Sequence, residues 1–309
     1  MVPLSHLSHH ALRVADVERS IRFYRDVVGI DLTERGPDGT AYMRRGPSHH
    51  ALALYPSGYA DPTDPEMTGG FGLDHVAFAV PDRSDVDEAA RVLKDAGETI
   101  LAGPVEWDEP GGPYSVRFRD PEGNRIEICA GMAESIGPEI PHAAKPTKLG
   151  HVILNAENPR ESAEFFTETL GFRVSDWIED FFVFLRCNPD HHATGMARGP
   201  ARTMHHTAYE VADIKAIKDS ADVAWKNDVR SLWGIGRHGP GHNLFVFYPD
   251  PDGNVIEIFA ELDQILDEAN YKPLRWEGKE SSGIWNHDIP SAFFAATRAS
   301  GKPVDDPGD

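Results

Sequence analysis

A glutamate and two histidines stand where their side chains could bind a metal ion. Glu257 lies between Ile256 and Ile258 in an apolar segment of strand length. Burying a carboxylate among isoleucines is costly unless a cation meets it, although strand alternation also allows Glu257 to point into solvent. His151 and His206 each begin another apolar segment of strand length. Two imidazoles and one carboxylate with open positions beside them form the facial ligand set of non-heme Fe(II) oxygenases.

An internal duplication favours the metal hypothesis over coincidence. The chain contains 15 histidines, so any one of them could be an ordinary core or surface residue. However, His9, His75 and Glu127 align with the three candidates when the first half of the chain is placed on the second, and His50 aligns with His192. The aligned segments are residues 8–30 with 150–172, 42–54 with 184–196, 72–82 with 203–213, and 117–130 with 246–260.

The repeated segments predict elements that would hold these side chains on a rigid sheet. Each half reads as two βαβββ-like modules, in which short apolar strands accompany a helix that ends near a glycine. The clearest helices are Val86–Ala96 and Ile214–Lys226. The last predicted strands are Leu244–Tyr248 and Val255–Phe259, joined by the turn Pro249–Asn254. Ligands placed on three strands of one curved sheet would be preset for metal binding.

The repeat also predicts how the chain divides. We expect an N-terminal unit over residues 1–132 and a C-terminal catalytic unit over residues 148–262, joined by a linker of residues 133–147 that contains proline, alanine and glycine. The tail, residues 263–309, matches no other part of the chain. Its beginning is compatible with a helix, and Gly301–Asp309 is polar and predicted to be disordered.

Composition predicts a soluble globular protein in the cytoplasm. The 309 residues suggest about two domains, and the hydrophobic and charged fractions are 40% and 26%. No apolar run approaches the ~20 residues that span a bilayer. The N-terminus lacks the pattern of a secretion signal, and Cys129 and Cys187 are expected to be reduced thiols. The net charge of -20 argues against nucleic acid or an anionic membrane as partner.

Several motifs resemble those of the type I extradiol ring-cleavage dioxygenases of the vicinal oxygen chelate superfamily. They are HVIL with a following FF and LGF, DHHA, MHHTAYEV, GRHGPGHNLFVFY and DPDGNVIEIF, spread over residues 6–262. The resemblance implies an α+β fold of four βαβββ modules, paired into two barrel-like domains (the glyoxalase/bleomycin-resistance-like fold). It implies extradiol cleavage of a catecholic ring with O2, in aromatic compound catabolism. The cofactor would be Fe(II), or Mn(II) as in a few members, and the protein a homo-oligomer (tetramer or dimer).

Carried over by position, the resemblance gives roles to five residues. His151, His206 and Glu257 would be the metal ligands. His192 would be the acid/base histidine beside the metal, and His238, from the GRHGPGHN loop, would be a second catalytic histidine facing the substrate. Histidine suits both roles because it titrates in the range needed to accept a proton and return it.

One position departs from the family pattern. The family usually has a tyrosine nine residues after the loop histidine, where this chain has Phe247, followed by Tyr248. Either a bulge turns Tyr248 inward as a catalytic residue, or the phenol is lost and Phe247 faces the substrate. The tail lacks a clear match to the arginine pair that members acting on arylacetate-type catechols carry. Arg237, His242 and Arg275 therefore remain candidates for contacting a polar substituent.

The N-terminal half keeps His9, His75, Glu127 and His50, although the family normally has no metal there. We interpret them as inherited residues, with a weak metal site as the alternative. The residue 19 positions before Glu127 is Asp108, where the C-terminal half has its loop histidine. A second catalytic site is therefore not expected.

Two other functions are compatible with this scaffold. One is a different metal-dependent reaction of the superfamily, such as isomerisation or hydrolysis. His192 and His238 argue against it. The other is a non-catalytic ligand-binding protein, which would lack the His-His-Glu set.

Overall fold

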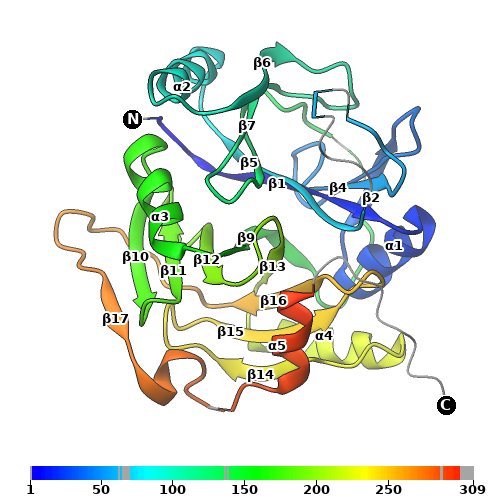
Figure 1. Cartoon of the computed structure of the whole chain (residues 1–309). Helices are drawn as coiled ribbons and strands as arrows, with labels where there is room; N and C mark the ends of the chain where they lie inside the picture. The colour runs from blue at the N-terminus through cyan, green and yellow to red at the C-terminus, as the bar shows by residue number, and fades with distance from the viewer. Residues whose placement is uncertain are drawn as a thin grey trace.

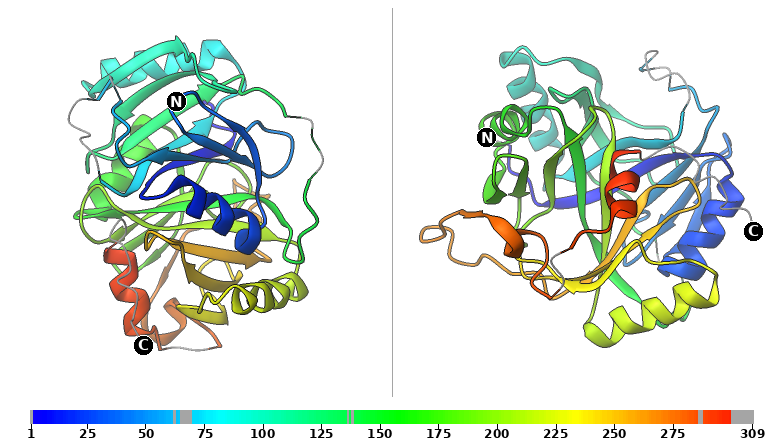
Figure 2. Two further views of the ribbon diagram at one scale, coloured as in Figure 1. Left: turned by 90° about the vertical axis from the view of Figure 1, so that its right-hand side faces the viewer. Right: turned by 60° about the horizontal axis from the view of Figure 1, so that its bottom comes forward.

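The computed structural model of the chain describes residues 2–61, 63–64, 70–135, 137, 139–285 and 288–299. Figure 1 shows two curved sheets lying one above the other, with the N-terminal half coloured from blue through cyan to blue-green and the C-terminal half from green to red. Helices pack against the sheets, and the C-terminal segment adds a strand and a short helix to the second half (Figure 2).

Each half contains two consecutive βαβββ modules. The first half consists of β1 (His6–Val14), α1 (Val17–Phe23), the π-helical turn η1 (Tyr24–Val28), β2 (Asp31–Arg35), β3 (Ala41–Arg44), β4 (Leu52–Pro56), β5 (Gly72–Ala79), α2 (Arg83–Asp95), β6 (Ile100–Glu106), β7 (Tyr114–Arg119) and β8 (Arg125–Ala130). The second half consists of β9 (Pro146–Ala156), α3 (Pro159–Glu164), the π-helical turn η2 (Phe165–Thr169), β10 (Arg173–Ile178), β11 (Phe182–Arg186), β12 (Thr194–Arg198), β13 (Met204–Val211), α4 (Ile214–Lys226), β14 (Trp233–Arg237), β15 (Leu244–Pro249) and β16 (Val255–Ala260). The tail adds β17 (Leu274–Trp276), the 3-10 turn η3 (Gly278–Ser281) and α5 (Ser291–Arg298).

The strand order explains how the modules combine. Among the described residues, the sheets run β2-β3-β4-β1-β5-β8-β7-β6 and β14-β15-β16-β13-β9-β12-β11-β10-β17. In every module the first strand pairs in parallel with the last, and the first strands of two modules pair antiparallel at the centre of the sheet. The predicted α+β fold of paired βαβββ modules is therefore confirmed.

Local sequence sets the limits of the helices. Asp213 caps α4 by accepting a hydrogen bond from the backbone N–H of Ala216, and the helix spans the predicted residues. Helix α2 begins three residues before its predicted start because Asp82 and Asp85 form a capping box there. Gly97 follows α2 with φ +80°, a conformation that glycine adopts without strain.

The two halves pack against each other, and buried side chains from both halves meet at two separate places. The Tyr24 hydroxyl donates to the Asp250 carboxylate across the interface at 2.9 Å, and burial raises the pKa of Asp250 to about 6. At the other place the rings of Phe78 and Phe172 meet edge to face at 4.9 Å between centroids.

Strand β9 begins at Pro146, so the last two residues of the predicted linker already pair within the C-terminal sheet.

The tail differs from its prediction. It does not begin as a helix, because Gln264 instead forms an isolated β-bridge with Asp190, and β17 then extends the second sheet beside β10. Gly301–Asp309 lies outside the described residues. Both cysteines are buried and free of disulfides. Among the described residues, the helices are all too short or too polar to cross a membrane.

Candidate metal centre and catalytic cavity

The three predicted ligands meet on one face of the central strands in the C-terminal half. Ala208 on β13 lies opposite His151 on β9 and opposite Glu257 on β16, and His206 lies two residues before Ala208. Because side chains alternate along a strand, all three point to the same side. The Nε2 atoms of the two histidines are 3.2 Å apart, and they lie 2.9 Å (His151) and 3.2 Å (His206) from Oε2 of Glu257.

This donor set fits a divalent metal ion. All three side chains are buried, and Glu257 forms its ion pairs with histidines. Burial raises the pKa of the Glu257 carboxyl, but His151 and His206 outweigh it and hold the pKa well below its usual range. Burial lowers the pKa of His206. Neutral imidazoles and an ionised carboxylate are the forms that bind metal, and a cation there would neutralise the buried charge.

Asn243 holds the glutamate in place. Its side-chain amide donates to Oε1 of Glu257 at 2.9 Å, which leaves Oε2 facing the two histidines. Such outer hydrogen bonds orient metal ligands and fix their geometry. Asn243 has no role among the sequence predictions, although this residue ends the GRHGPGHN motif.

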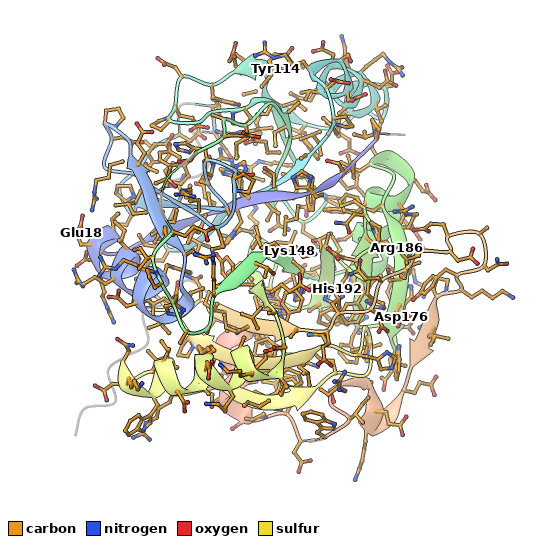
Figure 3. All side chains as sticks on the ribbon, turned by 180° about the vertical axis from the view of Figure 1, so that it is seen from behind. Glu18, Tyr114, Lys148, Asp176, Arg186 and His192 are labelled. Carbon is orange, nitrogen blue, oxygen red and sulfur yellow. The ribbon has the colours of Figure 1, made fainter. Side chains whose placement is uncertain are left out.

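His192 lies over the metal-binding face, and hydrogen bonds on the side away from the metal site orient its ring. Its ring centroid is 4.3 Å from that of His151. Its Nδ1 is 3.0 Å from Nδ1 of His191, whose Nε2 is 3.2 Å from a carboxylate oxygen of Asp176. Figure 3 shows His192 inside the C-terminal half with Asp176 nearby toward its edge. The Trp276 indole donates to the same carboxylate oxygen at 2.7 Å.

These contacts determine which nitrogen of His192 carries the proton. A carboxylate only accepts, so Nε2–H of His191 donates to Asp176, and Nδ1 of His191 accepts from Nδ1–H of His192. Nε2 of His192 is then the free base. Burial and the neighbouring His151 lower the pKa of His192 well below its usual range, which keeps the ring neutral. Neither Asp176 nor His191 was predicted. The only sequence signal was the pair of adjacent histidines in the DHHA motif, and it gave no indication of Asp176.

His238 approaches the site from the opposite side. Its Nδ1–H donates to the backbone carbonyl of Ser282 at 2.6 Å, so its Nε2 is free and lies 3.8 Å from Oε1 of Glu257. Its ring stacks on Phe245 with centroids 3.8 Å apart. Burial lowers the pKa of His238, and Glu257 opposes the shift without cancelling it. The predicted pair of cavity histidines thus comes together, but the tail contact through Ser282 was not foreseen.

The triad and both histidines line a cavity of about 270 Å³. Phe293 of α5 closes one side, with its ring 4.7 Å from that of Phe247 and 5.2 Å from that of Trp233. The other apolar lining residues are Ile178, Phe181, Phe182, Phe184, Pro240, Ile289 and Phe294. The tail therefore forms part of the cavity wall.

The catalytic assignment of Tyr248 is wrong. The β15–β16 pairing runs without a register shift, and Phe247, opposite Glu257, lines the cavity with its ring 5.4 Å from that of His206. Tyr248 therefore faces the other side, where it is buried in the main hydrophobic core. The inward bulge does not form, and an apolar ring takes the place of the phenol.

Three polar candidates also lie outside the cavity lining. Arg237 donates to the backbone carbonyl of His242 and to the carboxylate of Glu261. The His242 ring is exposed and pairs with Asp263, while Arg275 pairs with exposed Asp180. The prediction that these three residues contact a polar substituent of the substrate is therefore wrong, because their side chains bind partners outside the cavity.

Exchanging the aromatic residues of β15 tests this placement. Tyr248→Phe should change kcat by less than about threefold, because only a hydroxyl remote from the cavity is lost. Phe247→Tyr should be tolerated, because its ring already borders the cavity. Steady-state kinetics with metal content measured in parallel checks both. A tenfold or larger fall in kcat for Tyr248→Phe at unchanged metal content would contradict the assignment of the two faces.

The N-terminal half brings His9, His75 and Glu127 together in the same way. In this half Glu127 pairs with Arg117, and Asp108 occupies the position that corresponds to His238.

The chain belongs to the Glyoxalase/Bleomycin resistance protein/Dioxygenase superfamily, because residues 6–128 and 148–258 match its sequence profile. Its relatives include the manganese-dependent 2,3-dihydroxybiphenyl 1,2-dioxygenase of Geobacillus genomosp. 3, which is 26% identical over 98% of each chain. Metapyrocatechase 2 of Cupriavidus necator is 28% identical over 67% of this chain and 70% of its own. The Mn(II)-bound glyoxalase from Novosphingobium aromaticivorans has a TM-score of 0.83 and 27% identity, covering 99% of this chain and 96% of that chain.

Proposed function

We propose that this protein is a metal-dependent extradiol dioxygenase that opens a catecholic ring with O2. The observation that carries the proposal is the buried face of His151, His206 and Glu257, with the free Nε2 atoms of His192 and His238 directed to the same cavity. A non-catalytic binding protein would need neither the ligand set nor oriented bases. The related ring-cleaving dioxygenases support the reaction class.

The residues divide the work of such a reaction. His151, His206 and Glu257 would hold Fe(II) or Mn(II), and the bound ion would lower the pKa of the catechol hydroxyls and bring catechol and O2 together. His192, neutral with a free Nε2, can accept a hydroxyl proton and later return it to the opened ring. His238 offers a second free nitrogen across the cavity. The aromatic walls hold the ring and exclude water.

Isotope labelling tests the reaction class. Turnover of a catechol under 18O2 should give a ring-opened product in which both new oxygen atoms carry the label before aldehyde oxygen exchanges with water. A product with no label would show that the protein carries out another reaction of the superfamily, such as isomerisation or hydrolysis.

The cavity predicts a neutral, apolar substituent on the catechol. Among the described residues that line it, none is lysine or arginine, and exposed Glu179 adds a negative charge. A substrate carboxylate would lose water here without gaining a cation. We expect kcat/KM for an alkyl- or aryl-substituted catechol to exceed that for 3,4-dihydroxyphenylacetate by at least about tenfold. Equal values of kcat/KM for the two substrates would contradict the prediction that the cavity prefers an apolar substituent.

We also propose a cytoplasmic location and a homo-oligomeric state, dimer or tetramer. The two free, buried cysteines support the first, since thiols stay reduced there. Sedimentation velocity of the purified protein would test the second.

A further inference from the structure

The His-His-Glu cluster of the N-terminal half reproduces the backbone frame of the C-terminal one. Ala77 on β5 lies opposite His9 on β1 and opposite Glu127 on β8, as Ala208 does in the other half. The Nε2 atoms of His9 and His75 are 3.2 Å apart, and Nε2 of His75 is 3.7 Å from Oε2 of Glu127. All three side chains are buried. Each of the two sheets thus brings together two histidine nitrogens and a glutamate carboxylate in the same arrangement.

The two clusters differ in what lies beside the glutamate. Arg117 on β7 pairs with Glu127 in the ladder, just as Phe247 pairs with Glu257. Nε of Arg117 donates to Oε2 of Glu127 at 2.6 Å, so the guanidinium binds the oxygen that faces His75. Among the described residues, the hydrogen bonds and ion pairs of the equivalent carboxylate oxygen of Glu257 are with His151 and His206.

Arg117 is built into this position. It is 2% exposed, its Nη2 donates to Glu109 at 3.1 Å, and its guanidinium lies 3.9 Å from the centroid of the Trp107 ring. A second positive charge placed on the cluster would meet a fixed cation in a poorly hydrated setting, where charge repulsion is strong. The supporting residues have changed as well, since Pro113 stands where the other half has Asn243.

We infer that Arg117 is the resident cation of this second cluster and takes the place of a metal ion there. The guanidinium neutralises Glu127 and closes a divalent-metal site whose donor atoms are otherwise assembled. The full-length protein should therefore bind one metal ion per chain, although it carries two His-His-Glu clusters. The number of metal ions depends on Arg117, and not on the loss of a ligand.

Metal stoichiometry of Arg117 variants tests this inference. Arg117→Gln keeps a hydrogen-bond donor for Glu127 but removes the positive charge. After incubation with Mn(II) and gel filtration, elemental analysis should find one ion per chain in the unmodified protein and about two in Arg117→Gln. Arg117→Lys, which keeps the charge, should stay at one, and Arg117→Gln/Glu127→Gln should return to one. The readout is independent of any catechol reaction.

Two results would overturn the inference. One is a second Mn(II) in the unmodified protein, and the other is Arg117→Gln that folds and still binds a single ion. If loss of the charge weakens folding, thermal denaturation with and without Mn(II) gives the answer. Metal should raise the Tm of Arg117→Gln more than that of Arg117→Gln/Glu127→Gln, because only the former has a second site to stabilise. Equal shifts in Tm would contradict the proposal.

Discussion

Glu257→Gln is expected to abolish tight metal binding and, with it, turnover. The amide has lost the charge that balances a divalent ion, and its NH2 group would compete with the imidazoles for the same space. Altering an outer hydrogen-bond partner of a metal ligand already costs about 10–100-fold in affinity, so loss of a charged ligand should cost at least about 100-fold. Metal analysis after dialysis, together with kcat, measures both effects.

The chain supplies a matched control in Glu127→Gln. Glu127 has the same place in its ladder as Glu257, but it pairs with Arg117. Its replacement should leave metal content and turnover nearly unchanged, since Arg117 keeps its bond to Glu109. If Glu257→Gln still retained one metal ion per chain, or if Glu127→Gln halved the metal content, the assignment of the metal centre to the C-terminal half would be wrong.

His192→Ala and His238→Ala should separate catalysis from metal binding. Both rings direct an unprotonated Nε2 toward the cavity and are held through Nδ1, but neither belongs to the three converging donors. A positioned acid or base contributes about 10²–10⁴-fold to rate, so each variant should lose kcat on that order and keep its metal. Single-turnover kinetics under O2 would show whether the ring-opening phase itself has slowed.

His50→Ala is the matched control for these two variants. His50 corresponds to His192 and likewise contacts its neighbour, with Nδ1 of His49 and Nδ1 of His50 3.0 Å apart, but it lies in the N-terminal half. Its loss should leave kcat within about threefold of the original value. Near-normal turnover of His192→Ala or His238→Ala with full metal content would remove that histidine from the mechanism.

The duplication explains why so much of the fold and the ligand set could be predicted. Aligning the two halves identified His151, His206 and Glu257 through their place on strands, and the strand register then determines that they share a face. These features depend on local sequence or occur in both halves of the chain, so they can be recognised from a single sequence. The alternation of faces left Phe247 and Tyr248 as alternatives, and only the unshifted pairing of β15 with β16 shows that Phe247 borders the cavity.

The parts that could not be predicted depend on contacts between distant segments. Asp176 orients His192 through His191 only because β10 and the DHHA segment meet in space. The support of His238 by Ser282 and the wall formed by α5 come from a tail with no counterpart in the other half. Arg237 was misplaced because proximity in sequence does not determine which way a loop side chain turns.

One measurement tests the central claim most directly. The protein is stripped of metal, reconstituted without oxygen with Fe(II) or, in parallel, Mn(II), and mixed with an alkyl-substituted catechol before O2 is admitted. We expect uptake of one O2 per catechol and the yellow colour of a ring-opened semialdehyde, with neither in the metal-free protein or in Glu257→Gln. A protein that holds one metal ion per chain and binds the catechol, yet consumes no O2 with either metal across a series of catechols, would contradict the proposed function.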